Sequence, residues 1–248
     1  MKKFILYYLS IWCLFMIFGC GKSDDSESNN CIEVNGNIKI MPLGASRVQG
    51  YKPFYESYRY DLWNKLMEGG WDVDFVGNQD DDFFYGNDKE YCFDIDHQSK
   101  AGWTSAVIDN QIDNWLNEVE TPDIVLFSSP GANDIILGAS LEEIVPNIHS
   151  IITKIQAHNP DVTILIEQMA PPKSTFFDEN TKLIVEEVKS IINEIAQSKT
   201  TEKSLVIAVD MFTDFTDNYL ADEIHYNAEG ARLIANRYYE SLIPFLEN

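Results

Sequence analysis

The sequence predicts an α/β fold in which a parallel sheet of five strands lies between two layers of helices. Short apolar runs alternate along the chain with longer segments whose apolar residues recur at helical spacing. Strands separated by helices of this size form parallel β-α-β units. With 248 residues and 45% hydrophobic composition, the chain can bury one full core. We therefore expect a three-layer α/β/α sandwich over residues 36–248.

The predicted strands are short and apolar. In chain order they are Ile38–Leu43, Trp71–Val76, Ile124–Phe127, Val162–Glu167 and Ser204–Val209. The predicted helices lie between and after them and carry apolar residues along one stripe. They are Phe54–Glu68, Thr104–Val119, Ser140–His158, Asp178–Ser198 and Ala228–Leu246. Pro146 would move the start of the third helix to about Val145, because proline is excluded from helix interiors.

One connection, residues 78–100, is long, polar and without helical spacing. Loops of this length in compact domains are usually functional or disordered. It contains the aromatic run Phe83-Phe84-Tyr85, which either lines a cleft or attaches the loop to the domain.

The first thirty residues predict export. Met1-Lys2-Lys3 is a short basic region, and the apolar run that follows is too brief to span a bilayer comfortably. Residues 1–19 are therefore expected to be a signal peptide. Ile17-Phe18-Gly19-Cys20 resembles a bacterial lipobox, which implies a surface or periplasmic lipoprotein with lipid attached at Cys20. The stretch Lys22-Ser23-Asp24-Asp25 resembles the acidic export signal of Bacteroidetes lipoproteins, which implies the outer membrane or cell surface of a Gram-negative, Bacteroidetes-like cell. An uncleaved membrane anchor is the alternative. Residues 20–35 are expected to be a flexible acidic tether.

Two cysteines remain after the signal peptide and Cys20 are set aside. Cys31 and Cys92 lie in a chain expected outside the cytoplasm, where such pairs often form disulfides. A bridge would join the start of the domain to the long loop, and a free buried cysteine is the alternative for either residue. No cysteine or histidine pair has metal-ligand spacing, so we expect no metal site.

The formal net charge of −22 excludes nucleic acid as a partner and disfavours heavily charged glycans. Neutral substrates suit this surface better. Solubility or salt tolerance is an alternative explanation for the acidic excess.

Ser46 directly follows the first predicted strand. Gly44 permits a tight turn there, and ligands of open α/β sheets bind at the carboxyl ends of the strands. The alternative is that Ser46 only caps the next helix, and for this serine alone that alternative is favoured. Partners elsewhere in the chain are needed to reverse the preference.

Three later stretches are expected at the same sheet edge. Asp222 and His225 are spaced so that the carboxylate can hold Nδ1–H of the imidazole, leaving Nε2 to accept a serine proton. Asn133, after the third strand, is a neutral donor for an oxyanion. Gly102, where the long loop enters a helix, offers a backbone N–H. Each has an ordinary alternative: a helix-capping aspartate near a surface histidine, a local turn, and a glycine before a helix.

Together these residues resemble a known family. The stretches match, in order and spacing, the four blocks of the SGNH hydrolase superfamily, also called the GDSL family: Gly44-Ala45-Ser46, Gly102, Gly131-Ala132-Asn133-Asp134 and Asp222-Glu223-Ile224-His225. The resemblance covers about residues 36–246. Four further stretches are similar to carbohydrate esterases of the acetylxylan esterase type: Ile40–Gly44, Tyr58–Trp63, Val73–Gly77 and Ala101–Thr104.

The resemblance implies a flavodoxin-like fold and a serine esterase that needs no metal or organic cofactor. Ser46 would be the nucleophile, His225 the base and Asp222 its orienting carboxylate. The Ser46 and Gly102 N–H groups and the Asn133 side chain would form the oxyanion hole. The implied reaction removes small acyl groups, above all acetyl, from polysaccharide, and the chain is expected to act as a monomer. A lipase-like or lysophospholipase-like esterase and a non-catalytic glycan-binding lipoprotein are the alternatives.

Two residues depart from the family pattern. Ala45 stands where the family has aspartate, and Tyr226 stands where these esterases often have proline. Neither change removes an atom of the proposed triad. Other residues have open interpretations: Arg59 reaches the site or forms a salt bridge, and Trp103 stacks on a sugar or packs in the core. His97, His149 and His158 receive no role.

Overall fold

The computed structural model describes residues 31–81, 90–176 and 178–247. The expected signal peptide, Cys20, most of the tether and Phe83-Phe84-Tyr85 lie outside these ranges. In the described part of the chain, no helix has both the length and the apolarity required to cross a bilayer.

The centre of the molecule is a parallel sheet with strand order β2-β1-β4-β5-β6. Its strands are β1 (Ile38–Gly44), β2 (Val73–Phe75), β4 (Ile124–Phe127), β5 (Thr163–Gln168) and β6 (Val206–Asp210). A two-residue strand, β3 (Gln98–Ser99), pairs with the end of β1 through Leu43 and Gly44. Apart from this addition, the five-stranded parallel sheet agrees with the prediction, and β1 lies between β2 and the central strand β4.

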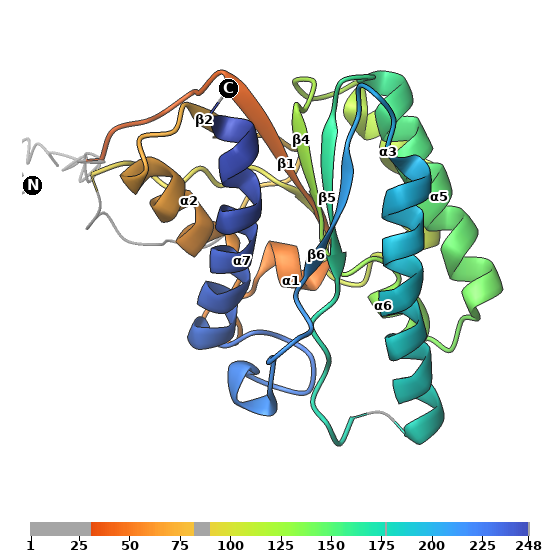
Figure 1. Cartoon of the computed structure of the whole chain (residues 1–248). Helices are drawn as coiled ribbons and strands as arrows, with labels where there is room; N and C mark the ends of the chain where they lie inside the picture. Colours follow the sequence, from red (N-terminus) through yellow and green to blue (C-terminus); the bar gives the residue numbers. More distant parts are fainter. Residues whose placement is uncertain (1–30, 82–89, 177, 248) are drawn as a thin grey trace, which may run out of the picture.

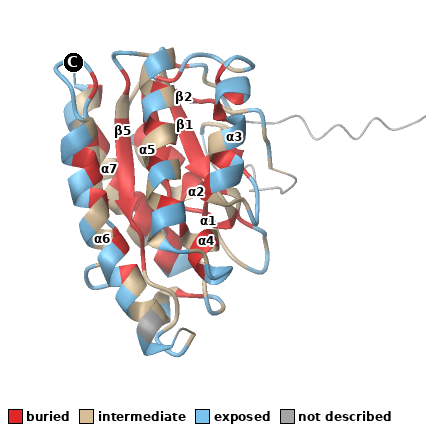
Figure 2. Cartoon of the chain, turned by 90° about the vertical axis from the view of Figure 1, so that its right-hand side faces the viewer, coloured by how far each residue is buried: buried red, intermediate tan, exposed pale blue. Residues whose placement is uncertain are grey.

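Helices cover both faces of the sheet, so the three-layer prediction is confirmed (Figure 1). One layer contains α1 (Ser46–Gln49), α2 (Arg59–Glu68) and α7 (Ala228–Leu246). The other contains α3 (Ser105–Leu116), α4 (Ala132–Ile136), α5 (Leu141–His158) and α6 (Glu179–Lys199). A 3-10 turn, Asp217–Tyr219, precedes α7. Buried residues gather on the strands and on the inward faces of the helices (Figure 2), giving one apolar core on each side of the sheet.

Two predicted helix starts are wrong. α2 begins at Arg59 and not at Phe54, because residues 51–55 close into a turn in which Tyr51 and Tyr55 exchange backbone hydrogen bonds. α5 spans Leu141–His158, in agreement with the predicted range Ser140–His158, and the expected shift of its start to about Val145 is wrong. Ser140 and Glu143 form a capping box at the start of the helix, and Pro146 and Glu142 are both exposed, so water can hydrogen-bond the carbonyl that the proline leaves unpaired.

A disulfide joins Cys31 to Cys92. Backbone hydrogen bonds reinforce it, from Ile32 N–H to the Glu90 carbonyl and from Cys92 N–H to the Ile32 carbonyl. The indole of Trp63 donates to the Cys92 carbonyl at 2.6 Å, which ties this bridge to α2. The first described residues are thereby attached to the long connection between β2 and α3.

Candidate active site

Ser46 is the first residue of α1 and lies where β1 leaves the sheet. Gly44 makes this turn possible: a Cβ atom there would lie 2.8 Å from Val48 Cγ2 and 3.0 Å from the Ser128 carbonyl oxygen. Ser46 is 9% exposed. The hydroxyl is therefore held at the carboxyl edge of the sheet, close to the surface.

His225 and Asp222 meet Ser46 in one line of hydrogen bonds. His225 Nε2 lies 2.9 Å from Ser46 Oγ, and His225 Nδ1 lies 2.8 Å from Asp222 Oδ2. Asp222 Oδ1 accepts the backbone N–H groups of Ile224 and His225 at 2.8 and 2.7 Å. Partial burial opposes ionisation of Asp222, but these hydrogen bonds outweigh it and lower the pKa of the carboxyl. The charged form of Asp222 is thus available to hold the imidazole.

The ring of Tyr55 covers the imidazole of His225. The two rings are stacked, with centroids 3.9 Å apart and planes 14° apart. Tyr55 comes from the turn that replaces the predicted start of α2, so sequence periodicity gave no indication of this contact. The stacking restricts tilting of the ring whose edge faces Ser46.

Arg47 connects the serine to the loop that carries the histidine. Its guanidinium donates twice to the Ile224 carbonyl, at 3.0 and 2.7 Å, and once to the Ala170 carbonyl, at 2.6 Å. It also lies over the ring of the fully buried Tyr226, 4.8 Å from its centroid. Tyr226, which departs from the family's proline, therefore has a specific partner. Nothing in the spacing of the sequence indicates this role for Arg47.

Asn133 and Gly102 lie on two segments that are bonded to one another. Asn133 Nδ2 donates to the Trp103 carbonyl at 2.8 Å, which leaves its second amide hydrogen for another acceptor. The buried Asp134 carboxylate accepts Ser105 N–H and Oγ–H at 2.8 and 2.6 Å. Gly102 has φ +86°, a conformation that favours glycine. The two predicted oxyanion donors are therefore fixed relative to each other.

The carboxylate of Glu167 lies behind this segment and is fully buried. It accepts Ser129 N–H at 2.7 Å and Ser129 Oγ–H at 3.1 Å, and Tyr238 Oη–H at 2.8 Å. Burial raises its pKa, although these hydrogen bonds oppose the shift. Glu167 thus holds the turn between β4 and α4, where Ser129 has φ +46°. An acidic residue ending an apolar strand was the available signal for this role.

Glu167→Gln is expected to weaken the pH dependence of stability. Since the folded-state pKa is raised, the wild type loses stability as pH rises above the unfolded value near 4.5. Glutamine does not titrate; its oxygen can accept from Ser129, and its amide can donate to the Tyr238 hydroxyl. The drop in Tm between pH 5 and pH 8 should be smaller in the variant. Burial raises the pKa of Asp94 to about 7, so Asp94 also contributes to the pH dependence of stability. Its contribution is the same in the wild type and the variant and therefore cancels in the comparison. Identical drops would refute this role for Glu167.

Other residues discussed from the sequence have structural roles. Arg59 is fully buried and forms an ion pair with Asp81 at 2.5 Å, with further bonds to the carbonyls of Val48, Gln49 and Ile95. Trp103 stacks on Trp115 with centroids 4.3 Å apart and packs against the core. His97 is buried beside Asp81 and Ser99. Among the described residues, no group of three or more His, Cys, Asp or Glu side chains is arranged to hold a metal ion.

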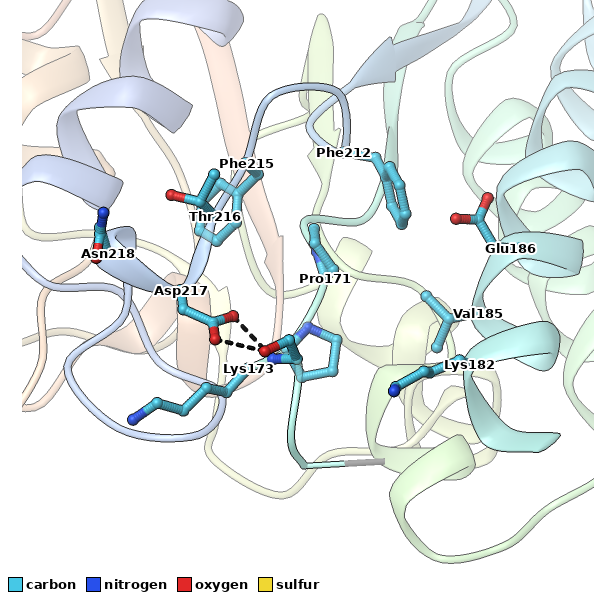
Figure 3. A pocket seen from close by; sticks show the side chains of 12 residues that line it. Pro171, Lys173, Lys182, Val185, Glu186, Phe212, Phe215, Thr216, Asp217 and Asn218 are labelled. Carbon is cyan, nitrogen blue, oxygen red and sulfur yellow. Dashed lines mark hydrogen bonds between the residues drawn. The ribbon is translucent and has the colours of Figure 1, made fainter. Parts of the chain in front are cut away.

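A cavity of about 620 Å³ lies between two connections at the same edge of the sheet (Figure 3). One connection follows β5 and contains Pro171, Pro172 and Lys173. The other follows β6, contains Phe212 and Asp217, and continues into Asp222 and His225. The cavity is therefore adjacent to the loop that carries the histidine.

Comparisons with known proteins show which family the chain belongs to. The multidomain esterase of Ruminococcus flavefaciens is 22% identical over 230 residues, which is 86% of this chain and 29% of that protein. The chain thus spans less than a third of that relative. A carbohydrate esterase family 3 structure from Talaromyces cellulolyticus is 27% identical, with a TM-score of 0.74 over 85% of this chain and 98% of that one.

An acetyl esterase, solved as a serine-to-alanine mutant with an acetate ion, is also similar. It is 27% identical, and the match has a TM-score of 0.73 over 85% of this chain and 98% of that one. The family profile described as GDSL-like Lipase/Acylhydrolase matches residues 44–233, a range that includes Ser46, Gly102, Asn133, Asp222 and His225. The chain belongs to the GDSL-like lipase/acylhydrolase family.

Proposed function

We propose that this chain is a carboxylic ester hydrolase that removes acetyl groups from a neutral polysaccharide. The observation that carries the proposal is the hydrogen-bonded series Asp222, His225 and Ser46. Gly102 and Asn133, the expected oxyanion donors, lie on two segments joined by the hydrogen bond from Asn133 to the Trp103 carbonyl. A serine used only for binding has no need of an imidazole aimed at its hydroxyl.

In the first half of the proposed reaction, His225 Nε2 takes the Ser46 proton while Oγ attacks the ester carbonyl. Asp222 holds Nδ1–H and stabilises the imidazolium that forms. The oxyanion accepts hydrogen bonds from Ser46 N–H, Gly102 N–H and the second amide hydrogen of Asn133. The tetrahedral intermediate then collapses and the bond between the acyl carbon and the sugar oxygen breaks. His225 gives its proton to that oxygen, the sugar leaves as an alcohol, and an acetyl-serine remains.

In the second half, His225 takes a proton from a water molecule, and the oxygen of that water attacks the acetyl carbonyl. Collapse of the second tetrahedral intermediate breaks the bond to Oγ, and the proton returns to Ser46 as acetic acid leaves. Arg47 and Tyr55 hold the histidine loop and ring during both halves. These steps use groups of the chain and water.

The acetyl and carbohydrate parts of the proposal are supported by two comparisons, because similar solved proteins are a carbohydrate esterase and an acetyl esterase. The net charge of −22 favours a neutral polymer over an acidic one. We also propose that the protein is exported, acylated at Cys20 and held at the outer membrane or cell surface, which the residue pattern at 1–25 supports. We propose as well that it acts as a monomer.

A series of p-nitrophenyl esters tests the acyl preference. We expect kcat/KM to be highest for acetate and to fall for butyrate and octanoate, and we expect acetate release from acetylated xylan or glucomannan. The expected fall is at least about tenfold, which corresponds to 1.4 kcal/mol. A preference that rises with chain length would reject the acetyl assignment and favour a lipase-like activity.

A further inference from the structure

The cavity beside the histidine loop is built from two connections that cross the end of the sheet. The segment after β5 contributes Pro171, Pro172 and Lys173, and the segment after β6 contributes Phe212 and residues 215–218. Helix α6 closes the third side with Lys182, Val185 and Glu186 (Figure 3). Ser174 holds the two connections together by donating its N–H and hydroxyl to Asp217 at 2.8 and 2.6 Å. These bonds also lower the pKa of Asp217, so this carboxylate remains charged.

Three contacts link the cavity to the candidate active site. Lys173 N–H donates to the carbonyl of Glu223, between Asp222 and His225, at 2.8 Å. Phe215 lines the cavity and packs edge-on against Tyr226, with centroids 5.8 Å apart. Pro172 and Val185 line both the cavity and a narrow crevice that reaches Arg47 and Ala132, the neighbours of Ser46 and Asn133. A molecule held in the cavity would therefore lie next to the catalytic loop.

The cavity combines an aromatic face with a rim of polar groups. The ring of Phe212 faces the cavity, and Lys189 Nζ lies 4.2 Å from its centroid. Around it stand the ammonium groups of Lys173 and Lys182, the carboxylates of Glu186 and Asp217, and the amide of Asn218. Glu179 pairs with Lys182 at 2.7 Å, so with Lys189 and Glu179 included there are three positive and three negative groups around the cavity, and neither sign dominates. Sites of this size that mix apolar walls with a few polar groups are typical of small-molecule binding.

We propose that this cavity is a subsite for a neutral sugar unit of the same polysaccharide whose ester is cleaved at Ser46. The inference rests on the proposed esterase function and extends it from the acyl group to the carbohydrate chain. A sugar ring can place its C–H face on Phe212 while its hydroxyls reach the lysines, carboxylates and Asn218. A long acyl chain is a poorer occupant, because it would desolvate four charged groups without replacing their hydrogen bonds. Because the positive and negative charges around the cavity balance, an anionic ligand is not favoured either.

Phe212→Ala is expected to weaken the use of polymer and to spare a substrate without a sugar. KM for acetylated xylan or acetylated glucomannan, whichever the wild type hydrolyses faster, should rise about tenfold, while kcat changes little. The kcat/KM for p-nitrophenyl acetate should stay within about twofold of the wild-type value. Phe212→Leu, which keeps apolar bulk but removes the flat face, should show the same split if the alanine variant is poorly folded.

Phe54→Ala is the matched control. Phe54 is a phenylalanine that is 67% exposed and lies outside the cavity, on the turn before α2 that also carries Tyr55, and its ring stacks on Tyr51 with centroids 5.2 Å apart. Its removal should leave the KM for polymer unchanged. A second readout needs no catalysis: migration in native gels containing deacetylated xylan or glucomannan should be retarded for wild type and for Phe54→Ala, and less so for Phe212→Ala and Phe212→Leu.

The outcomes separate the subsite from the esterase assignment. Unchanged KM and unchanged retardation in both Phe212 variants overturn the subsite, and so does a polymer defect confined to Phe54→Ala. Hydrolysis of p-nitrophenyl acetate but of neither polymer by the wild type also overturns the subsite, while the esterase assignment stands. If the wild type cleaves no ester at all, the esterase assignment fails, and the gel experiment still decides whether Phe212 binds sugar.

Discussion

Ser46→Ala is expected to reduce hydrolysis of p-nitrophenyl acetate to background, a loss of roughly 10⁶-fold in kcat if the proposed triad acts as a unit. Without Oγ there is no nucleophile to form the acyl-enzyme, although His225 and the oxyanion donors remain. The fold should be retained, because the change removes one hydroxyl at the edge of the sheet and leaves the bonds of Arg47 to Ile224 and Ala170 in place. We expect the Tm to change by no more than about 2 °C.

Ser241→Ala provides the control for serine removal. Ser241 lies in α7 and donates to the carbonyl of Arg237 in its own helix, so its loss should not affect turnover. Full activity of Ser46→Ala would disprove the nucleophile assignment. Loss of activity together with a large fall in Tm would point to misfolding, and circular dichroism of both variants would detect it.

Asp222→Asn is expected to lower kcat by about 10⁴-fold with little change in structure. The asparagine oxygen can still accept the backbone N–H groups of Ile224 and His225, which now bind Asp222 Oδ1. Its amide group, however, would face His225 Nδ1 as a donor. The imidazole would then carry its proton on Nε2, where it could no longer accept the proton of Ser46.

Asp210→Asn is a matched control for that change. Asp210 ends β6, and one of its carboxylate oxygens accepts the backbone N–H groups of Phe212 and Thr213 at 2.8 Å each, much as Asp222 does in its own turn. This variant should keep its activity on p-nitrophenyl acetate. If Asp222→Asn retained more than about a tenth of wild-type kcat, the orienting role of Asp222 would be rejected.

The sheet was predictable because its strands are continuous apolar runs, as in Ile124–Phe127, and because each is separated from the next by enough chain for a helix. The two-residue strand β3 has no such pattern. It forms because Gln98 and Ser99 are brought beside Leu43 and Gly44, a contact between distant segments. The expected shift of the α5 start to about Val145 has a different cause. It followed from Pro146 alone and did not take account of the local capping box of Ser140 and Glu143, at which the helix begins.

The candidate site was predictable where chemistry depends on residue type and spacing, as for Asp222 and His225. The residues around it were not. Arg47, Tyr55 and Glu167 act through contacts with segments more than 35 residues away, and the partners of an arginine, tyrosine or glutamate cannot be read from spacing along one chain. Tyr226 looked like an isolated departure from the family pattern until its contact with Arg47 was visible.

The contact between Arg47 and Tyr226 bears on how this branch of the family diversified. One position adjoins Ser46 and the other adjoins His225, and the guanidinium contacts both the Tyr226 ring and the Ile224 carbonyl. Proline at position 226 alone would remove the aromatic ring that the Arg47 guanidinium packs against. Replacement of Arg47 alone would leave the Tyr226 ring buried without its cation and the Ile224 carbonyl without these hydrogen bonds. Proteins descended from an ancestor with this pair should therefore keep both residues or lose both. In an alignment of relatives, positions 47 and 226 should covary.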